Sequence, residues 1–277
     1  MANESAPEVL KFDRATVRYD EVTALDSVSL TLREGETVVI LGAAGSGKTV
    51  LLKTGLGLIK PDEGHVYLFG RDTGAMTEDA LREIRSQMGI LFQEGGLFDS
   101  LTIEENVAYP LENQKAQRPP AGEIATRVRQ ALRFVELEHT LEKVPSELSG
   151  GMRRRVGIAR AVVTRPALVL YDSPTAGLDP ITANTIMALI AKERDTRNTT
   201  TALATHRYQD GHLLANYRYN AKIDRLEPAN GDAGDHARRT RFVVLGDGRV
   251  VFEGSQAELE SSDDPYVAKF ARFDRMK

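Results

Sequence analysis

Hydrophobic and polar positions follow two different patterns along this chain. Residues 9–19 and 27–32 alternate with a period of two and contain β-branched side chains, which predicts an antiparallel β opening. Residues 37–41, 167–171 and 200–204 are instead short, continuous apolar runs, as expected of parallel strands buried on both faces. The pattern therefore predicts an antiparallel region followed by a buried sheet.

Segments with helical periodicity separate the buried strands. They are residues 48–58, 77–85, 123–134, 150–163 and 181–194. Strands that alternate with helices predict a right-handed, mostly parallel sheet. Near the end of the chain, residues 242–245 and 249–252 flank Asp247-Gly248, which predicts a β-hairpin, and residues 256–273 form a closing helical region.

The domain organisation follows from these elements. We expect one large α/β domain at residues 9–255, between a tail at 1–8 and a helical extension at 256–277. Within the domain, a helical subdomain is inserted at about residues 94–165. A polar, turn-rich insertion at about 216–241 is expected to be exposed and mobile.

Composition narrows the classes of protein. The 277 residues are 41% apolar and 27% charged, which is typical of a soluble globular chain. A net charge of -4 gives no electrostatic case for nucleic-acid binding, and the lack of cysteine excludes disulfides and thiolate metal sites. The beginning does not resemble a secretory signal, and no apolar run is long enough to span a bilayer. Any membrane role is therefore expected to come through a partner.

The strand at 37–41 leads directly into a glycine-rich loop and a helix. The loop matches G-x-x-x-x-G-K-S/T in the strand-to-helix context that this motif requires. Its amides would face phosphates, Lys48 would reach the β and γ phosphates, and Thr49 would hold Mg²⁺. The predicted nucleotide contacts are Gly42, Ala43, Ala44, Gly45, Ser46, Gly47, Lys48, Thr49 and Val50. The alternative is a glycine-rich turn with a surface lysine.

Polar residues follow the other strands. Asp172 ends the second buried strand and would be the acidic partner of Mg²⁺, or alternatively a helix cap. Gln93 follows a short strand at 90–92, either as a metal contact or as a solvated linker. His206, directly after the third buried strand, would form a hydrogen bond to a γ-phosphate or have a structural role. Tyr19 would stack on adenine or simply pack.

A second glycine turn lies in Leu148-Ser149-Gly150-Gly151-Met152, where it opens a helix. Such a turn offers backbone donors to a γ-phosphate that belongs to another subunit. Ser149, Gly150 and Gly151 therefore predict a homodimer that sandwiches nucleotide.

Together these motifs resemble the ATP-binding subunits of ABC transporters, over residues 9 to about 255. The motifs stand in the order Tyr19, Gly42–Thr49, Gln93, Leu148–Met152, Asp172, Asp179 and His206. The resemblance implies an α/β phosphate-loop nucleotidase with a mostly parallel core sheet, an antiparallel β subdomain and an inserted helical subdomain. It further implies that two chains clamp two ATP molecules, that Ser149 and Gly151 act across the dimer, and that Asp179 couples the sites.

Several shorter sequence segments more specifically resemble the MlaF or Mkl-type subunits of MCE-linked phospholipid transport. These are Leu91–Phe98, Asn106–Leu111, Met152–Arg155, Asp179–Thr182 and Asp264–Val267. The implied partners are an MlaE-like inner-membrane permease, to which the helical insertion carries motion, and indirectly a periplasmic MCE-domain lipid carrier. The implied location is cytoplasmic, peripheral on the inner membrane.

One position departs from the family pattern. Where the family has a glutamate after the magnesium aspartate, as its proposed general base, this chain has Ser173. A serine hydroxyl positions water but is not basic enough near pH 7 to take its proton usefully. Phosphoryl transfer depends mostly on positioning and charge stabilisation, so Lys48, Gln93 and His206 with Mg²⁺ would sustain a slower reaction. The expected catalytic set is Lys48, Gln93, Ser173 and His206, and the expected metal set is Thr49, Gln93 and Asp172.

Three functions are compatible with these residues. The first is the ATPase subunit of a lipid-exporting or lipid-importing ABC transporter, with slow hydrolysis. The second is an ATP-gated binding module with little hydrolysis, as Ser173 permits. The third is a soluble cassette protein that works on ribosomes or in DNA repair. Two cassettes in one chain or a long coiled-coil insert would favour the third, and the sequence contains neither.

Overall fold

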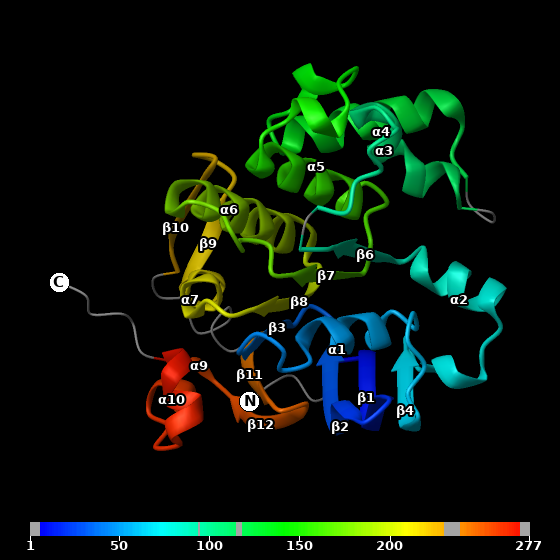
Figure 1. The fold of residues 1–277 in the computed structure, drawn as a ribbon. Helices are drawn as coiled ribbons and strands as arrows, with labels where there is room; N and C mark the ends of the chain where they lie inside the picture. The colour runs from blue at the N-terminus through cyan, green and yellow to red at the C-terminus, as the bar shows by residue number, and fades with distance from the viewer. Residues whose placement is uncertain (1–5, 94, 115–117, 230–238, 272–277) are drawn as a thin grey trace.

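The computed structural model describes residues 6–93, 95–114, 118–229 and 239–271. In this part of the chain a parallel core sheet lies between a helical layer and an antiparallel sheet (Figure 1). This layered α/β arrangement agrees with the fold class expected from the sequence.

The core sheet has the strand order β12-β11-β3-β8-β7-β6. All neighbouring strands are parallel except β12, which pairs antiparallel with β11. The strands are β3 (Thr37–Gly42), β6 (Met88–Leu91), β7 (Leu168–Asp172), β8 (Thr200–Thr205), β11 (Thr240–Gly246) and β12 (Arg249–Gly254). Because parallel strands end at the same edge, the residues that follow β3, β7 and β8 converge there, which is where α/β proteins bind ligands.

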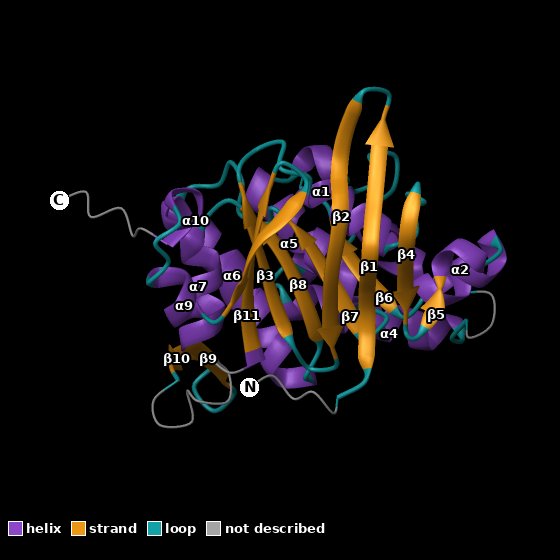
Figure 2. Cartoon of the chain, turned by 90° about the horizontal axis from the view of Figure 1, so that it is seen from below, coloured by secondary structure: helices purple, strands orange, loops and turns teal. Residues whose placement is uncertain are grey.

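The antiparallel sheet has the order β2-β1-β4-β5. Its strands are β1 (Glu8–Tyr19), β2 (Val22–Arg33), β4 (Glu63–Leu68) and β5 (Arg71–Asp72). Figure 2 shows β1, β2 and β4 in front of the core strands. The sequence pattern predicted only residues 27–32 of β2 and did not predict β4 or β5. In β4 and β5, glycine and charged residues interrupt the alternation of apolar and polar positions.

Helix α1 (Lys48–Gly55) lies between the two sheets, where Leu51 and Leu52 are buried with apolar side chains of both. The sequence predicted a helix that continues to residue 58. It ends earlier because Gly57 adopts a φ of 65°. Leu58 N–H then donates to Lys53 C=O at 2.9 Å, which closes the carboxyl end of the helix.

Helices α5 (Gly150–Val162) and α6 (Pro180–Arg197) lie over the other face of the core sheet, and α3 (Ile103–Glu112) and α4 (Ala121–Phe134) pack on α5. Their apolar sides share one buried cluster with Val169 and Tyr171 of β7. Helix α2 (Glu78–Arg85) precedes β6 and lies outside this layer.

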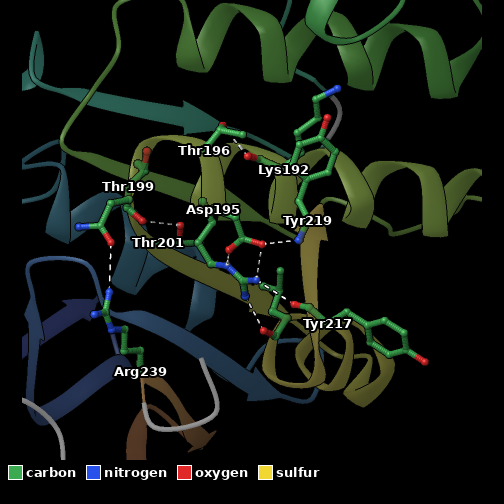
Figure 3. A network of polar contacts seen from close by, with 11 residues as sticks. Lys192, Asp195, Thr196, Thr199, Thr201, Tyr217, Tyr219 and Arg239 are labelled. Carbon is green, nitrogen blue, oxygen red and sulfur yellow. Dashed lines mark hydrogen bonds and ion pairs between the residues drawn. The ribbon is translucent and has the colours of Figure 1, made fainter. Parts of the chain in front are cut away.

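The polar segment that follows α7 (Tyr208–Asn216) is not an exposed loop over residues 217–228. It forms the antiparallel hairpin of β9 (Tyr217–Asn220) and β10 (Arg225–Pro228), and all of β9 is half-buried against α6. Asp195 accepts from Tyr219 N–H at 2.7 Å (Figure 3). Its neighbour Arg194 donates to Tyr217 C=O at 2.9 Å. The expectation of an exposed loop is therefore wrong for β9, which is fixed to α6, whereas residues 221–225 at the hairpin tip are exposed as expected. Residues 230–238 lie outside the described residues.

The chain ends in two short helices, α9 (Gln256–Glu260) and α10 (Pro265–Ala271), where the sequence predicted one helical region. Leu259 and Val267 bury their side chains against Phe242 and Val244 of β11. Among the residues that the structure describes, no helix is both long enough and apolar enough to cross a bilayer.

Candidate ATP-binding site

The glycine loop curls tightly at the end of β3. Gly47 precedes the first residue of α1 with a φ of 100°, and Gly45 has a φ of 79°. A Cβ atom on Gly47 would lie 2.5 Å from the carbonyl oxygen of Ala24, so only glycine fits there. The loop and the amino end of α1 thus form a concave surface of amides of the kind that binds phosphate.

A cavity of about 850 Å³ lies over this loop. Its volume is within the usual range for a small-molecule site. Residues that the sequence predicted line it from several strand ends, namely Ala43, Ala44, Gly45, Gly47, Lys48, Thr49, Val50, Gln93, Ser173 and His206. Six further lining residues were missed, namely Val22, Thr23, Ala24, Ala176, Asp247 and Gly248. The glycine turn at Asp247-Gly248 was predicted only as a hairpin, because no short motif marks it as part of a site.

Lys48 is buried at the floor of the cavity. Its ammonium group donates to the carbonyl oxygens of Gly42 and Ala43, both at 2.7 Å. Burial lowers the pKa of Lys48 from its ordinary value, while the negative charge of Asp172 opposes this shift. Gly42 and Ser46 support the loop from within rather than lining the cavity.

Two oxygen-bearing side chains meet beside the loop. Thr49 Oγ1 donates to Asp172 Oδ2 at 2.8 Å, and Asp172 is buried at the end of β7. Gln93 lines the same cavity two residues after β6. Hydroxyl, carboxylate and amide oxygens are the donors that Mg²⁺ prefers, so the residues present fit this ion.

Ser173 occupies a strained position between the cavity and β7. Its φ is 49°, its hydroxyl donates to Asp172 Oδ1 at 3.2 Å, and its N–H donates to Ala204 C=O at 2.8 Å. Ser173 therefore lines the cavity, held in a backbone conformation that costs free energy in a non-glycine residue.

Asp210, which sequence reasoning missed, joins the loops after β7 and β8. One of its carboxylate oxygens accepts from Thr175 Oγ1 at 2.6 Å and from Thr205 Oγ1 at 2.7 Å. Burial raises the pKa of Asp210, and the two threonine hydroxyls oppose that shift. This bridge joins the loop that carries Ser173 to the strand end that precedes His206.

Tyr19 and the Ser-Gly-Gly turn do not line the cavity of their own chain. Tyr19, at the end of β1, is 49% exposed and pairs with Val22, which does line it. Ser149 caps α5 by accepting from Met152 N–H at 3.2 Å. A Cβ atom on Gly151 would lie 2.6 Å from Thr182 of α6.

Asp179 lies next to this turn, at the start of α6. Its carboxylate accepts from the N–H groups of Ile181 and Thr182, both at 3.0 Å. The hydrogen bond to the Thr182 side chain is the main reason that the pKa of Asp179 is lowered, with backbone N–H donors adding to it. The turn at 149–151 and Asp179 thus form one surface, separate from the cavity.

Comparison with known proteins supports this geometry. Residues 25–176 match the family model described as "ABC transporter". The chain is 34% identical to the intermembrane phospholipid transport system ATP-binding protein MlaF of Escherichia coli K12, over 88% of this chain and 81% of that protein. It is 41% identical to the methionine import ATP-binding protein MetN of Corynebacterium efficiens, over 90% of this chain and 62% of that protein.

The MetN protein of Mesorhizobium japonicum is 37% identical over 73% of this chain, and the match spans only 55% of its own length. Among solved structures, the dimeric bacterial ABC transporter cassette MJ0796 superposes with a TM-score of 0.74 at 32% identity, covering 89% of this chain and 98% of that one. A post-hydrolysis state of the same cassette, bound to ADP and Pi, gives a TM-score of 0.73. With its phosphate loop, its acidic strand end and these matches, the chain belongs to the ABC transporter family.

Proposed function

We propose that this chain is the ATP-hydrolysing subunit of a transporter that moves phospholipid through an inner-membrane permease of the MlaE type. The observation that carries the ATPase part is the single cavity in which the phosphate loop, Gln93, Ser173 and His206 meet. The chain would act from the cytoplasmic face of the membrane, with a periplasmic MCE-domain carrier as an indirect partner.

The roles of the cavity residues follow from their chemistry. Thr49, Gln93 and Asp172 would hold Mg²⁺, which when bound supplies positive charge to the β and γ phosphates. Lys48 would exchange its loop carbonyl partners for phosphate oxygens, and His206 would donate to the γ-phosphate. Ser173 would orient the attacking water without removing its proton.

A homodimer completes the proposed site. Ser149, Gly150 and Gly151 lie away from the cavity of their own chain, so they would serve the nucleotide of a second copy. Tyr19, half-exposed at the rim beside Val22, would stack on adenine. Asp179 touches the same surface as the turn and would link the two sites.

One measurement distinguishes an ATP-hydrolysing subunit from an ATP-gated binding module. Phosphate release by the purified full chain with Mg²⁺ and ATP is compared with that of Lys48→Ala, which removes the phosphate-binding ammonium. Release above this control supports the ATPase. Tight ATP binding with release equal to the control would favour the ATP-gated binding module instead.

Phospholipid is favoured as cargo because MlaF proteins match along most of their length, 81% in E. coli and 90% in Haemophilus influenzae. Methionine import is a second candidate, supported by the 41% identity to a MetN protein. The full chain is affinity-purified from detergent-extracted native membranes, and ATP turnover of the complex is measured in nanodiscs. Turnover that responds to phospholipid composition supports lipid transport, whereas turnover that responds to methionine and its binding protein would overturn it.

A further inference from the structure

Arg154 links the helical layer to the cavity without lining it. It lies on α5, five residues after Ser149, and its side chain crosses to the loop that follows β7. One guanidinium nitrogen donates to the carbonyl oxygens of Pro174 at 2.6 Å and of Ser173 and Ala176 at 3.2 Å. Arg154 is only 8% exposed, so these bonds form in a largely dry environment.

The loop that Arg154 holds is the one that carries Ser173 and Ala176 into the cavity. Residues 173–176 form a turn, in which Ala176 N–H donates to Ser173 C=O at 3.1 Å. Three carbonyl oxygens that point at one place repel each other unless a cationic donor lies between them. Ser173 also keeps a φ of 49°, a conformation that persists only when surrounding contacts impose it.

We propose that Arg154 is a positioning residue for ATP hydrolysis, which acts by holding Ser173 and the turn at 173–176 in the cavity. Because it lies on the helix that the turn at 149–151 opens, it also ties that turn to the hydrolytic site. Any displacement of α5 would then move Ser173. This inference rests on the proposed ATPase, but its effect on the position of residue 173 is measurable without hydrolysis.

The first test uses the absence of cysteine from the chain. In Ser173→Cys, the single thiol reports the exposure of position 173 through its rate of reaction with a disulfide reagent. Adding Arg154→Gln is expected to raise this rate severalfold, because the turn loses its donor and opens more often. An unchanged rate in correctly folded double variant would overturn the proposal, whether or not the chain hydrolyses ATP.

Arg194→Gln in the same Ser173→Cys background is the matched control. Arg194 is similarly buried and donates to the carbonyl oxygens of Leu214 and Tyr217, neither of which lines the cavity. It is expected to lower thermal stability while leaving the thiol reaction rate unchanged. An equal increase in both variants would show that loss of stability, rather than loss of the Arg154 contacts, exposes the thiol.

The second test is kinetic. A misplacement of about 1 Å at a reacting centre costs up to about 10²-fold in rate, so Arg154→Gln is expected to lower kcat by up to that factor and to change KM for ATP much less. Arg154→Lys keeps a cationic donor for the same carbonyl oxygens and should recover part of the rate. In a Ser173→Ala background, Arg154→Gln should lower kcat little further, because both substitutions act through the Ser173 side chain.

The outcomes are distinct. Arg154 does not act through Ser173 if the two substitutions lower kcat independently, so that their effects add in the double variant. The same conclusion follows if Arg154→Gln raises KM for ATP and leaves kcat unchanged. If Arg154→Gln fails to fold, Arg154→Lys in the thiol and kinetic assays still decides the matter. Phosphate release no greater than that of Lys48→Ala would refute the proposed ATPase, while the thiol result would still test Arg154.

Discussion

Replacing Ser173 with glutamate tests whether proton removal limits the proposed ATP hydrolysis. The new carboxylate would enter the cavity where the Ser173 hydroxyl now lies 3.2 Å from Asp172 Oδ1. A positioned general base contributes about 10²- to 10⁴-fold to a rate, so kcat of Ser173→Glu should rise by up to that range. Ser173→Gln has the same shape without basicity and should give no comparable gain.

The same change carries a cost that the structure lets us estimate. The added carboxylate would lie about 5 Å from that of Asp172, and two like charges at that distance repel by roughly 3 kcal/mol at an effective dielectric near 20. A domain of this size loses roughly 2–4 °C of Tm per kcal/mol, so the variant should melt about 6–12 °C lower when free of Mg²⁺ and ATP. Mg²⁺ with ATP should restore much of the loss by placing positive charge between the carboxylates.

The assay is steady-state phosphate release as a function of pH, with thermal unfolding followed in parallel. Repulsion from Asp172 and burial both raise the pKa of the new carboxyl, so the rate should increase as pH rises through that value. An equal gain in Ser173→Gln, or no gain in Ser173→Glu despite normal ATP binding, would refute the argument that a missing base limits turnover.

Three further predictions concern other parts of the molecule. Gly47→Ala places a Cβ atom 2.5 Å from a main-chain oxygen of β2 and should abolish ATP binding, whereas Gly45→Ala, with no atom within 4 Å, should weaken it less in the same fluorescence titration. Glu193 is buried with an unpaired carboxylate oxygen, and burial raises its pKa above 4.5. The folded chain therefore binds this proton more tightly than the unfolded chain, so stability falls as pH rises from 4.5 through the folded pKa. Glu193→Gln should raise Tm at pH 8 and lose that advantage near pH 4.5; a constant difference would contradict the pKa assignment. Asp195→Ala leaves the buried Arg194 without its 2.6 Å partner and should cost about 3–5 kcal/mol in urea unfolding, with ATP affinity unchanged. A loss below 1 kcal/mol would show that the hairpin at 217–228 is held by other contacts.

Local pattern was sufficient for most of the core elements. The apolar runs at 37–41, 167–171 and 200–204 became β3, β7 and β8 within one residue at either end, because strands buried on both faces leave a continuous apolar signature. The hairpin of β9 and β10 left no such signature. Its side chains are polar and its partners, Arg194 and Asp195, are remote in sequence, so only the folded chain brings them together.

The sequence by itself identified the groups predicted to handle phosphate: a glycine loop with Lys48 and Thr49, an acidic strand end at Asp172, and the serine at position 173. These assignments depend on residue type and local spacing, which a chain carries before it folds. Tertiary structure alone decided that Thr49 meets Asp172, that Asp210 bridges two loops, and that Arg154 reaches from α5 to the turn behind Ser173. Such contacts depend on how separate strands and helices pack, and no local sequence pattern encodes which residues of different elements meet.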